Sequence, residues 1–158
     1  MSARLLLTLA TACAVLLPHT LSAQLADAKA LTAGAVKKIL AAAEAKAAEN
    51  KWNVAIAVVD PGGDLLGFVR LDGASAGTAQ VSVGKAKTAA KFGRPTKVYA
   101  DRVLADTLTF LSVDGVYTLQ GGLPIIVNGR VIGAVGVSGV TSAQDEQVAA
   151  AGIAAVIP

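Results

Sequence analysis

The amino-acid sequence predicts an α+β fold, in which an antiparallel sheet of about five strands carries helices on both faces. Two hairpin signals support the sheet: the turn cluster 60–64 and the dipeptide Asn128-Gly129 each lie between apolar runs rich in β-branched residues. Apolar residues at helical spacing mark the middle and both ends of the region 31–157. Because hairpins join antiparallel strands, this order excludes a doubly wound parallel sheet.

The first helix and the first hairpin are predicted from local signals. Thr32 is a suitable N-cap and Asn50 a reasonable stop for a helix. Between them, apolar residues recur at helical spacing, at Val36, Ile39, Leu40, Ala43 and Ala47. The runs 52–59 and 65–71 are β-branched or large and apolar, which predicts the two strands of the hairpin.

The middle of the chain predicts two helices, over 78–92 and 97–108. Gly93 is a C-terminal stop for the first of them, and Pro95 follows just beyond. The first helix is rich in alanine and glycine, such as Gly84, which favours close packing against another element.

The remaining elements complete the sheet and end in a helix. An extended segment is expected at 116–119 and a sharp turn at 121–124. Strands are expected at 125–127 and 131–137, joined by a turn that needs positive φ. Thr141 and Gln144 fit a capping box, so a final helix should run to about Val156.

The N-terminal segment has the three parts of a cleavable export signal. Arg4 gives a basic start, residues 5–17 form an apolar run, and Ala23 is a small residue at the end. The run is shorter than the roughly 20 apolar residues that span a bilayer. We therefore expect residues 1–23 to be a signal peptide and residues 24–158 a single domain, periplasmic or secreted, with no membrane span.

Loss of this leader would remove most metal-binding side chains. The one cysteine, the one histidine and the one methionine are Cys13, His19 and Met1. Because residues 24–158 contain no His or Cys, they cannot form a transition-metal site from these ligands, and no metal site is predicted. A buried N-terminal helix or a lipid anchor at Cys13 is the alternative interpretation of the leader.

The charge of the chain argues against nucleic acid and for self-association. Its formal net charge is +3, and the basic residues form no dense run. Charged residues make up 16% of the chain, against about 25% in an average soluble domain. Such a low charge predicts that much of the surface is buried in a homo-oligomer.

Three stretches resemble the GlcG/HbpS family, also called the haem-degrading domain family. They read IAVVDPGGDLLGFVRLDGA, GKAKTAAKFGRPT and LQGGLPIIVNGRVIGAVGVSG, and the likeness covers residues 31–157. The resemblance implies a profilin-like fold and dimers that build larger rings or octamers. Because some members bind haem outside the membrane, it also implies an exported haem- or tetrapyrrole-binding protein.

A haem site needs an apolar slot, cations for the propionates and usually an axial ligand. Residues 24–158 offer only Tyr99 and Tyr117 as ligands, and Lys85, Lys91 and Arg94 are the candidate cations for the propionates. The family uses a His ligand in some members, and this sequence departs from that pattern. Each tyrosine could equally be a core or interface residue.

The glycines Gly121 and Gly122 give a second candidate for anion binding. Consecutive glycines let backbone N–H groups approach a carboxylate or a haem propionate, although the same pair also suits a tight strand connection. With Arg70 and Lys85 they would form the pocket of an enzyme, or enzyme accessory, acting on a small organic acid. Arg70 could instead pair with Asp72 for structural reasons.

Catalysis is left open, because no complete catalytic constellation occurs in residues 24–158. The sequence Ser82-Val83-Gly84-Lys85 matches S-x-x-K but lacks the companion motifs of penicillin-interacting enzymes.

Overall fold

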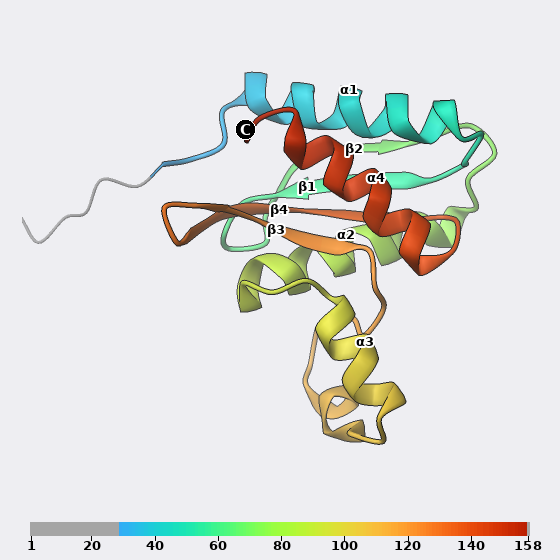
Figure 1. The fold of residues 1–158 in the computed structure, drawn as a ribbon, viewed down its shortest axis with the longest axis vertical. Coiled ribbons are helices and arrows are strands. Elements are labelled where there is room, and N and C mark those ends of the chain that lie inside the picture. Colours follow the sequence, from blue (N-terminus) through green and yellow to red (C-terminus); the bar gives the residue numbers. More distant parts are fainter. Residues whose placement is uncertain (1–28, 158) are drawn as a thin grey trace, which may run out of the picture.

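The computed structural model describes residues 29–157, which form a four-stranded antiparallel sheet with helices on both faces (Figure 1). The predicted signal peptide lies outside the described residues. The elements are α1 (Ala33–Glu49), β1 (Ala55–Val59), β2 (Leu65–Arg70), α2 (Ala76–Phe92), α3 (Lys97–Leu104), the 3₁₀ helix η1 (Leu108–Ser112), β3 (Gly122–Val127), β4 (Arg130–Ser138) and α4 (Ser142–Ala154).

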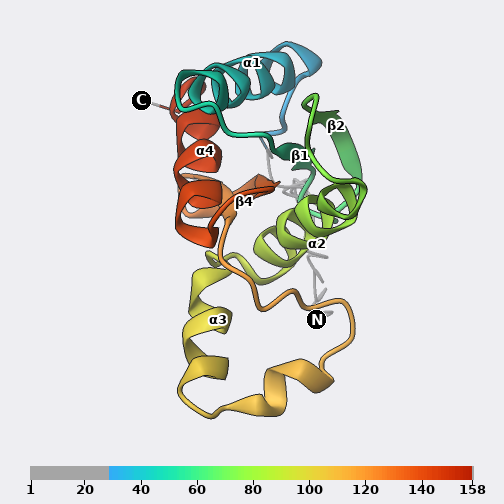
Figure 2. The ribbon, with the colours of Figure 1, turned by 90° about the vertical axis from the view of Figure 1, so that its right-hand side faces the viewer.

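The strands lie in the order β2-β1-β4-β3, so β1 and β4 are central and β2 and β3 are the edges. Helices α1 and α4 pack together on one face, and α2 covers the other (Figures 1 and 2). Ala57 of β1 is opposite Phe68 on β2 and Gly136 on β4. All pairings are antiparallel, which confirms the predicted fold class.

Strand β1 is buried along its whole length, and its two faces carry side chains of different size. Ile56 and Val58 belong to the larger core beneath α1 and α4. Ala57 and Val59 belong to a second cluster beneath α2, whose other buried members are all alanines. The alternation follows from the two-residue period of a strand. Small residues on the second face let α2 approach the sheet closely.

The predicted start of α1, end of α2 and start of α4 are confirmed. Thr32 Oγ1 accepts a hydrogen bond from the Ala35 N–H at 3.1 Å. Thr141 and Gln144 form the capping box of α4. Gly93 ends α2 in the left-handed conformation, with φ 62°.

The predicted fifth strand at 116–119 is wrong, because the described residues form a sheet of four strands. The Tyr117 N–H donates to Thr88 Oγ1 on α2 at 2.9 Å instead of to a strand. The turn predicted at 121–124 is also shorter than expected. Only Gly121 has positive φ, at 121°, and β3 begins at Gly122.

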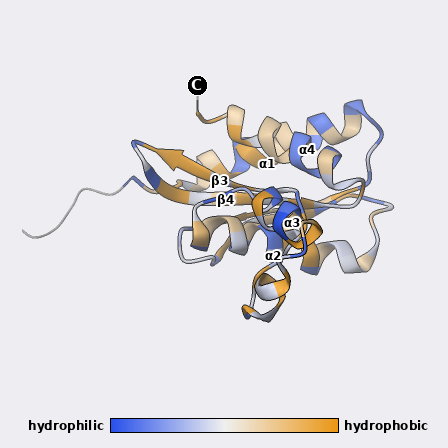
Figure 3. Cartoon of the chain, turned by 60° about the horizontal axis from the view of Figure 1, so that its bottom comes forward, coloured by the Kyte–Doolittle hydropathy of each residue, from blue (hydrophilic) through white to orange (hydrophobic). Residues whose placement is uncertain are grey.

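The helix predicted over 97–108 ends at Leu104, and Asp106 then takes a left-handed conformation with φ 68°. Residues 97–115, which we call the projecting segment, extend away from the sheet (Figure 2). Figure 3 shows hydrophobic residues on this segment; Leu104 is 86% exposed and Leu111 is 60% exposed. None of the helices between residues 29 and 157 has the length and apolar character needed to cross a bilayer.

Candidate functional site

A buried ion pair ties α2 to the opposite side of the sheet. Lys85 Nζ lies 2.7 Å from Asp145 Oδ2 on α4, and both side chains are only 2% exposed. The ammonium also donates to the carbonyl of Val137 on β4 at 2.9 Å, and the Val140 N–H donates to Asp145 Oδ1. Lys85 thus connects a helix, a strand and a second helix, and its charge is satisfied inside the protein.

Burial raises the pKa of the Asp145 carboxyl above its ordinary value. Loss of hydration disfavours the charged form, and this effect outweighs the hydrogen bond and the positive charge of Lys85, which act in the opposite direction. The folded chain therefore holds a proton on Asp145 at a pH where the unfolded chain has released it.

We expect this carboxyl to make the protein less stable as pH rises through the interval between its unfolded and folded pKa values. In that interval the folded state binds more protons, so the free energy of unfolding falls with pH. Urea unfolding of the wild type and of the double variant Lys85→Met/Asp145→Leu, from about pH 3 to pH 7, measures this effect. The double variant lacks the Asp145 carboxyl, so the difference between the two proteins gives its contribution to stability. If the wild type instead gains stability relative to the double variant as pH rises, Lys85 lowers the pKa of Asp145 and the prediction is contradicted.

The glycines Gly121 and Gly122 lie directly beside this ion pair. Gly121 has φ 121°, which favours glycine, and a Cβ atom there would be 2.7 Å from Asp145 Cβ and 2.9 Å from Lys85 Nζ. The Gly122 N–H donates to Thr96 Oγ1 at 2.9 Å, and the Gly122 carbonyl accepts from the Thr96 N–H. The structure brings Lys85 and both glycines together, but the polar groups of Lys85 and Gly122 are bonded within the protein.

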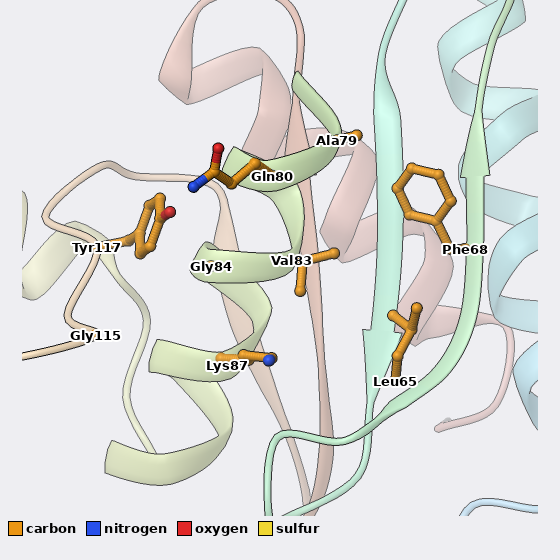
Figure 4. Close-up of a pocket in the computed structure, with 9 residues that line it drawn as sticks. All are labelled: Leu65, Phe68, Ala79, Gln80, Val83, Gly84, Lys87, Gly115 and Tyr117. Carbon is orange, nitrogen blue, oxygen red and sulfur yellow. The ribbon is translucent and has the colours of Figure 1, made fainter. Parts of the chain in front are cut away.

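An open apolar groove of about 520 Å³ runs over the outer surface of α2 (Figure 4). That volume lies within the roughly 300–1,000 Å³ of small-molecule sites. Its floor is α2, including Val83 and Gly84, and Figure 4 shows Phe68 on one side of the helix and Tyr117 on the other. The full lining is Leu65, Phe68, Ala79, Gln80, Val83, Gly84, Lys87, Gly115 and Tyr117.

The position of Tyr117 is determined by α2. A Cβ atom on Gly84 would overlap the Tyr117 ring, so the ring lies directly against the bare backbone of the helix. Thr88 Oγ1 accepts from the Tyr117 N–H and lies 2.9 Å from the Gly84 carbonyl, to which it donates. Glycine and threonine one helical turn apart therefore hold the phenol at the groove.

The other predicted site residues lie elsewhere. Tyr99 is 4% exposed and makes edge-to-face contacts with Phe92 and Phe110, at centroid distances of 5.6 and 5.3 Å. Arg94 is exposed beyond the end of α2. Arg70 is exposed on β2, at the opposite edge of the sheet from Gly122. The structure therefore does not bring Arg70 to the other residues predicted for a small organic acid.

Sequence reasoning missed Phe68 and Lys87, which both line the groove. The spacing of Gln80, Gly84 and Lys87 places them on one face of a helix, and this signal was available in the sequence. No such signal links Phe68 to α2, because the contact depends on how β2 packs beside the helix. Among residues 29–157, no group of three or more His, Cys, Asp or Glu side chains could hold a metal ion.

A haem group fits the chemistry of this groove. The walls are apolar, Tyr117 offers a phenol oxygen suited to ferric iron, and Lys87 offers a cation for a propionate. The fold and groove together define a small α+β protein with an open apolar groove over one helix. The chain belongs to the HbpS-like family: the family model described as "Haem degrading protein HbpS-like" matches residues 31–154.

Individual relatives agree with this assignment and with the GlcG/HbpS resemblance. Protein GlcG of Escherichia coli K12 is 43% identical over 100 residues, which cover 63% of this chain and 75% of GlcG. The crystal structure of HbpS is 34% identical, with a TM-score of 0.78 over 84% of this chain and 94% of HbpS. A PduOC:heme complex is 27% identical, with a TM-score of 0.74 over 82% of this chain and 96% of that protein.

Proposed function

We propose that this protein binds haem or a related tetrapyrrole in the groove over α2. The observation that carries the proposal is the groove itself, where an apolar floor and walls lie between a phenol and an ammonium group. The solved PduOC relative was crystallised with haem, and HbpS-like proteins are described as haem degrading, which supports the same ligand class.

Three kinds of residue would hold the group. Tyr117 is the candidate ligand for iron, because a phenolate stabilises the ferric state. Lys87 would meet a propionate, while Phe68 and Val83 would contact the ring. Bound haem supplies an iron centre able to change oxidation state. The protein's contribution is to hold the ring, position the phenol and limit access of water.

A haemin titration followed by absorbance tests this proposal. We expect saturable binding by the wild-type protein, and a change of spectrum with at least about tenfold weaker binding in Tyr117→Phe, because loss of one iron ligand removes a strong contact. Tyr99→Phe is the matched control, since Tyr99 is enclosed by Phe92 and Phe110, and it should bind as the wild type does.

A second pair of variants tests whether haemin binds in this groove. Ala79→Trp would fill the groove, whereas Ala150→Trp adds the same bulk on the exposed surface of α4. We expect only the first to abolish haemin binding. Absence of saturable binding in the wild type, or equal binding by all four variants, would contradict the proposal.

We also propose that the protein is exported to the periplasm or secreted, and that it acts as a homo-oligomer. The leader at residues 1–23 supports export. The low charge and the exposed leucines of the projecting segment, among them Leu104 and Leu111, support association with further copies.

A further inference from the structure

A second groove lies at the end of the molecule where α1 begins and the β3–β4 hairpin turns (Figure 1). It has a volume of about 640 Å³. The start of α1 and the residues that follow α4 contribute to it, and these two helices cover the face of the sheet opposite α2. The second groove shares no lining residue with the groove over α2. Its apolar lining includes Leu31, Ala35, Ile126, Val156 and Ile157.

A smaller pocket of about 200 Å³ continues the second groove at the hairpin. Lys29, Asn128 and Ile132 line both, so the two form one continuous surface. Arg130 lines only the smaller pocket, whereas the residues that follow α4 line only the second groove. The surface therefore has cations towards one end and a larger apolar part at the other.

The charged side chains that line this surface are all basic. Lys29 and Arg130 are both exposed, and neither belongs to an ion pair among residues 29–157. No acidic side chain lines the second groove or the smaller pocket. Asp60 precedes the lining residue Pro61, but its Oδ1 accepts a hydrogen bond from the Asp64 N–H at 2.8 Å within its own turn. An anion at this end would therefore meet two cations that have no partner among the described residues.

We propose that this surface binds a fatty acid, with the carboxylate between Lys29 and Arg130 and the alkyl chain along the second groove. Arg130 can bind a carboxylate through two parallel N–H groups, and the apolar lining removes the chain from water. A surface with one cationic end and one apolar end suits a single chain with an anionic head better than a neutral lipid or a small anion. The inference goes beyond haem binding and does not depend on it, because the groove over α2 lies on the other side of the sheet.

Calorimetric titration of the protein with decanoate tests the proposal. We expect saturable binding that is about tenfold tighter than the binding of octanoate, because two more CH₂ groups leave water. Decanol has a chain of the same length without the charge. It should bind about tenfold more weakly than decanoate, since hydrogen bonds to an ionised carboxylate are the stronger ones. Affinity that does not depend on chain length would contradict burial of the chain.

Charge reversal locates the carboxylate. Lys29→Glu and Arg130→Glu should each weaken decanoate binding by about tenfold or more. Both should leave decanol binding nearly unchanged, which also shows that the variants are folded. Lys37→Glu is the matched control, because Lys37 is exposed on α1 and lines neither the second groove nor the smaller pocket. An equal loss of decanoate binding in all three variants would overturn the proposal, since net charge alone would then explain it.

Filling the second groove locates the alkyl chain. Ala35→Trp places bulk inside the groove, whereas Ala41→Trp adds the same bulk on the exposed surface of α1. Only the first should abolish binding of decanoate and of decanol. Ala79→Trp, which fills the groove over α2, should bind decanoate as the wild type does. Absence of saturable decanoate binding, binding only to vesicles of phosphatidylglycerol, or a loss in Ala79→Trp equal to that in Ala35→Trp would each overturn the proposal.

Discussion

Replacing Lys85 by methionine, with Asp145 left in place, should lower the free energy of unfolding at pH 7 by about 3–5 kcal/mol. Both side chains are only 2% exposed, so the variant would enclose a carboxylate that has lost its cation. The Val137 carbonyl would lose its donor as well. Such a loss is a large part of the roughly 5–15 kcal/mol that stabilises a typical domain. Urea unfolding measures it directly.

The double variant Lys85→Met/Asp145→Leu is the control for this result. Removing both charges leaves no isolated ion, so we expect most of the lost stability to return. A single variant within about 1 kcal/mol of the wild type would contradict the buried pair, because that is the range of exposed pairs such as Lys97–Asp101.

Replacing Gly136 by valine should be comparably damaging, at about 3 kcal/mol or more. Gly136 lies on β4 where α2 crosses it, and a Cβ atom there would overlap the Ser82 carbonyl and the Ala86 nitrogen. These are backbone atoms within a helix, which cannot move aside as a side chain can. The helix would have to lift from the sheet, and the alanine cluster beneath it would open.

Gly77→Ala is the matched control within α2, because a Cβ atom on Gly77 would meet nothing within 4 Å. Alanine has the higher helix propensity, so this variant should be slightly more stable than the wild type. Thermal unfolding of both variants makes the comparison. Equal, small effects at Gly136 and Gly77 would show that α2 does not pack as closely on β4 as described.

The parts of the fold that depend on local patterns could be predicted from the sequence. Thr32, Gly93 and the Thr141–Gln144 box bound their helices as expected, and both hairpins form at the predicted turns. The fifth strand could not be excluded, because residues 116–119 have an ordinary extended pattern. Their backbone bonds instead to a threonine side chain on α2, which is a contact between distant parts of the chain.

The site was predictable only in part, for the same reason. Tyr117 was identified as a candidate ligand by elimination, and the structure places it at the groove. Lys85 was also identified, but its partner Asp145 is 60 residues away, and nothing local indicates that the pair is buried. Gly84 shows a signal of close approach in the sequence, although only the fold reveals that an aromatic ring occupies the space.

The location of bound iron tests the central claim most directly. Crystals of the protein grown with haemin, measured by anomalous diffraction at the iron edge, would give the position of the metal without assumptions about the ring. We predict one iron site in the groove over α2, beside the Tyr117 oxygen. Iron at another surface, such as the groove between α1 and the β3–β4 hairpin lined by Lys29 and Ile126, or no bound iron at saturating haemin, would contradict the account.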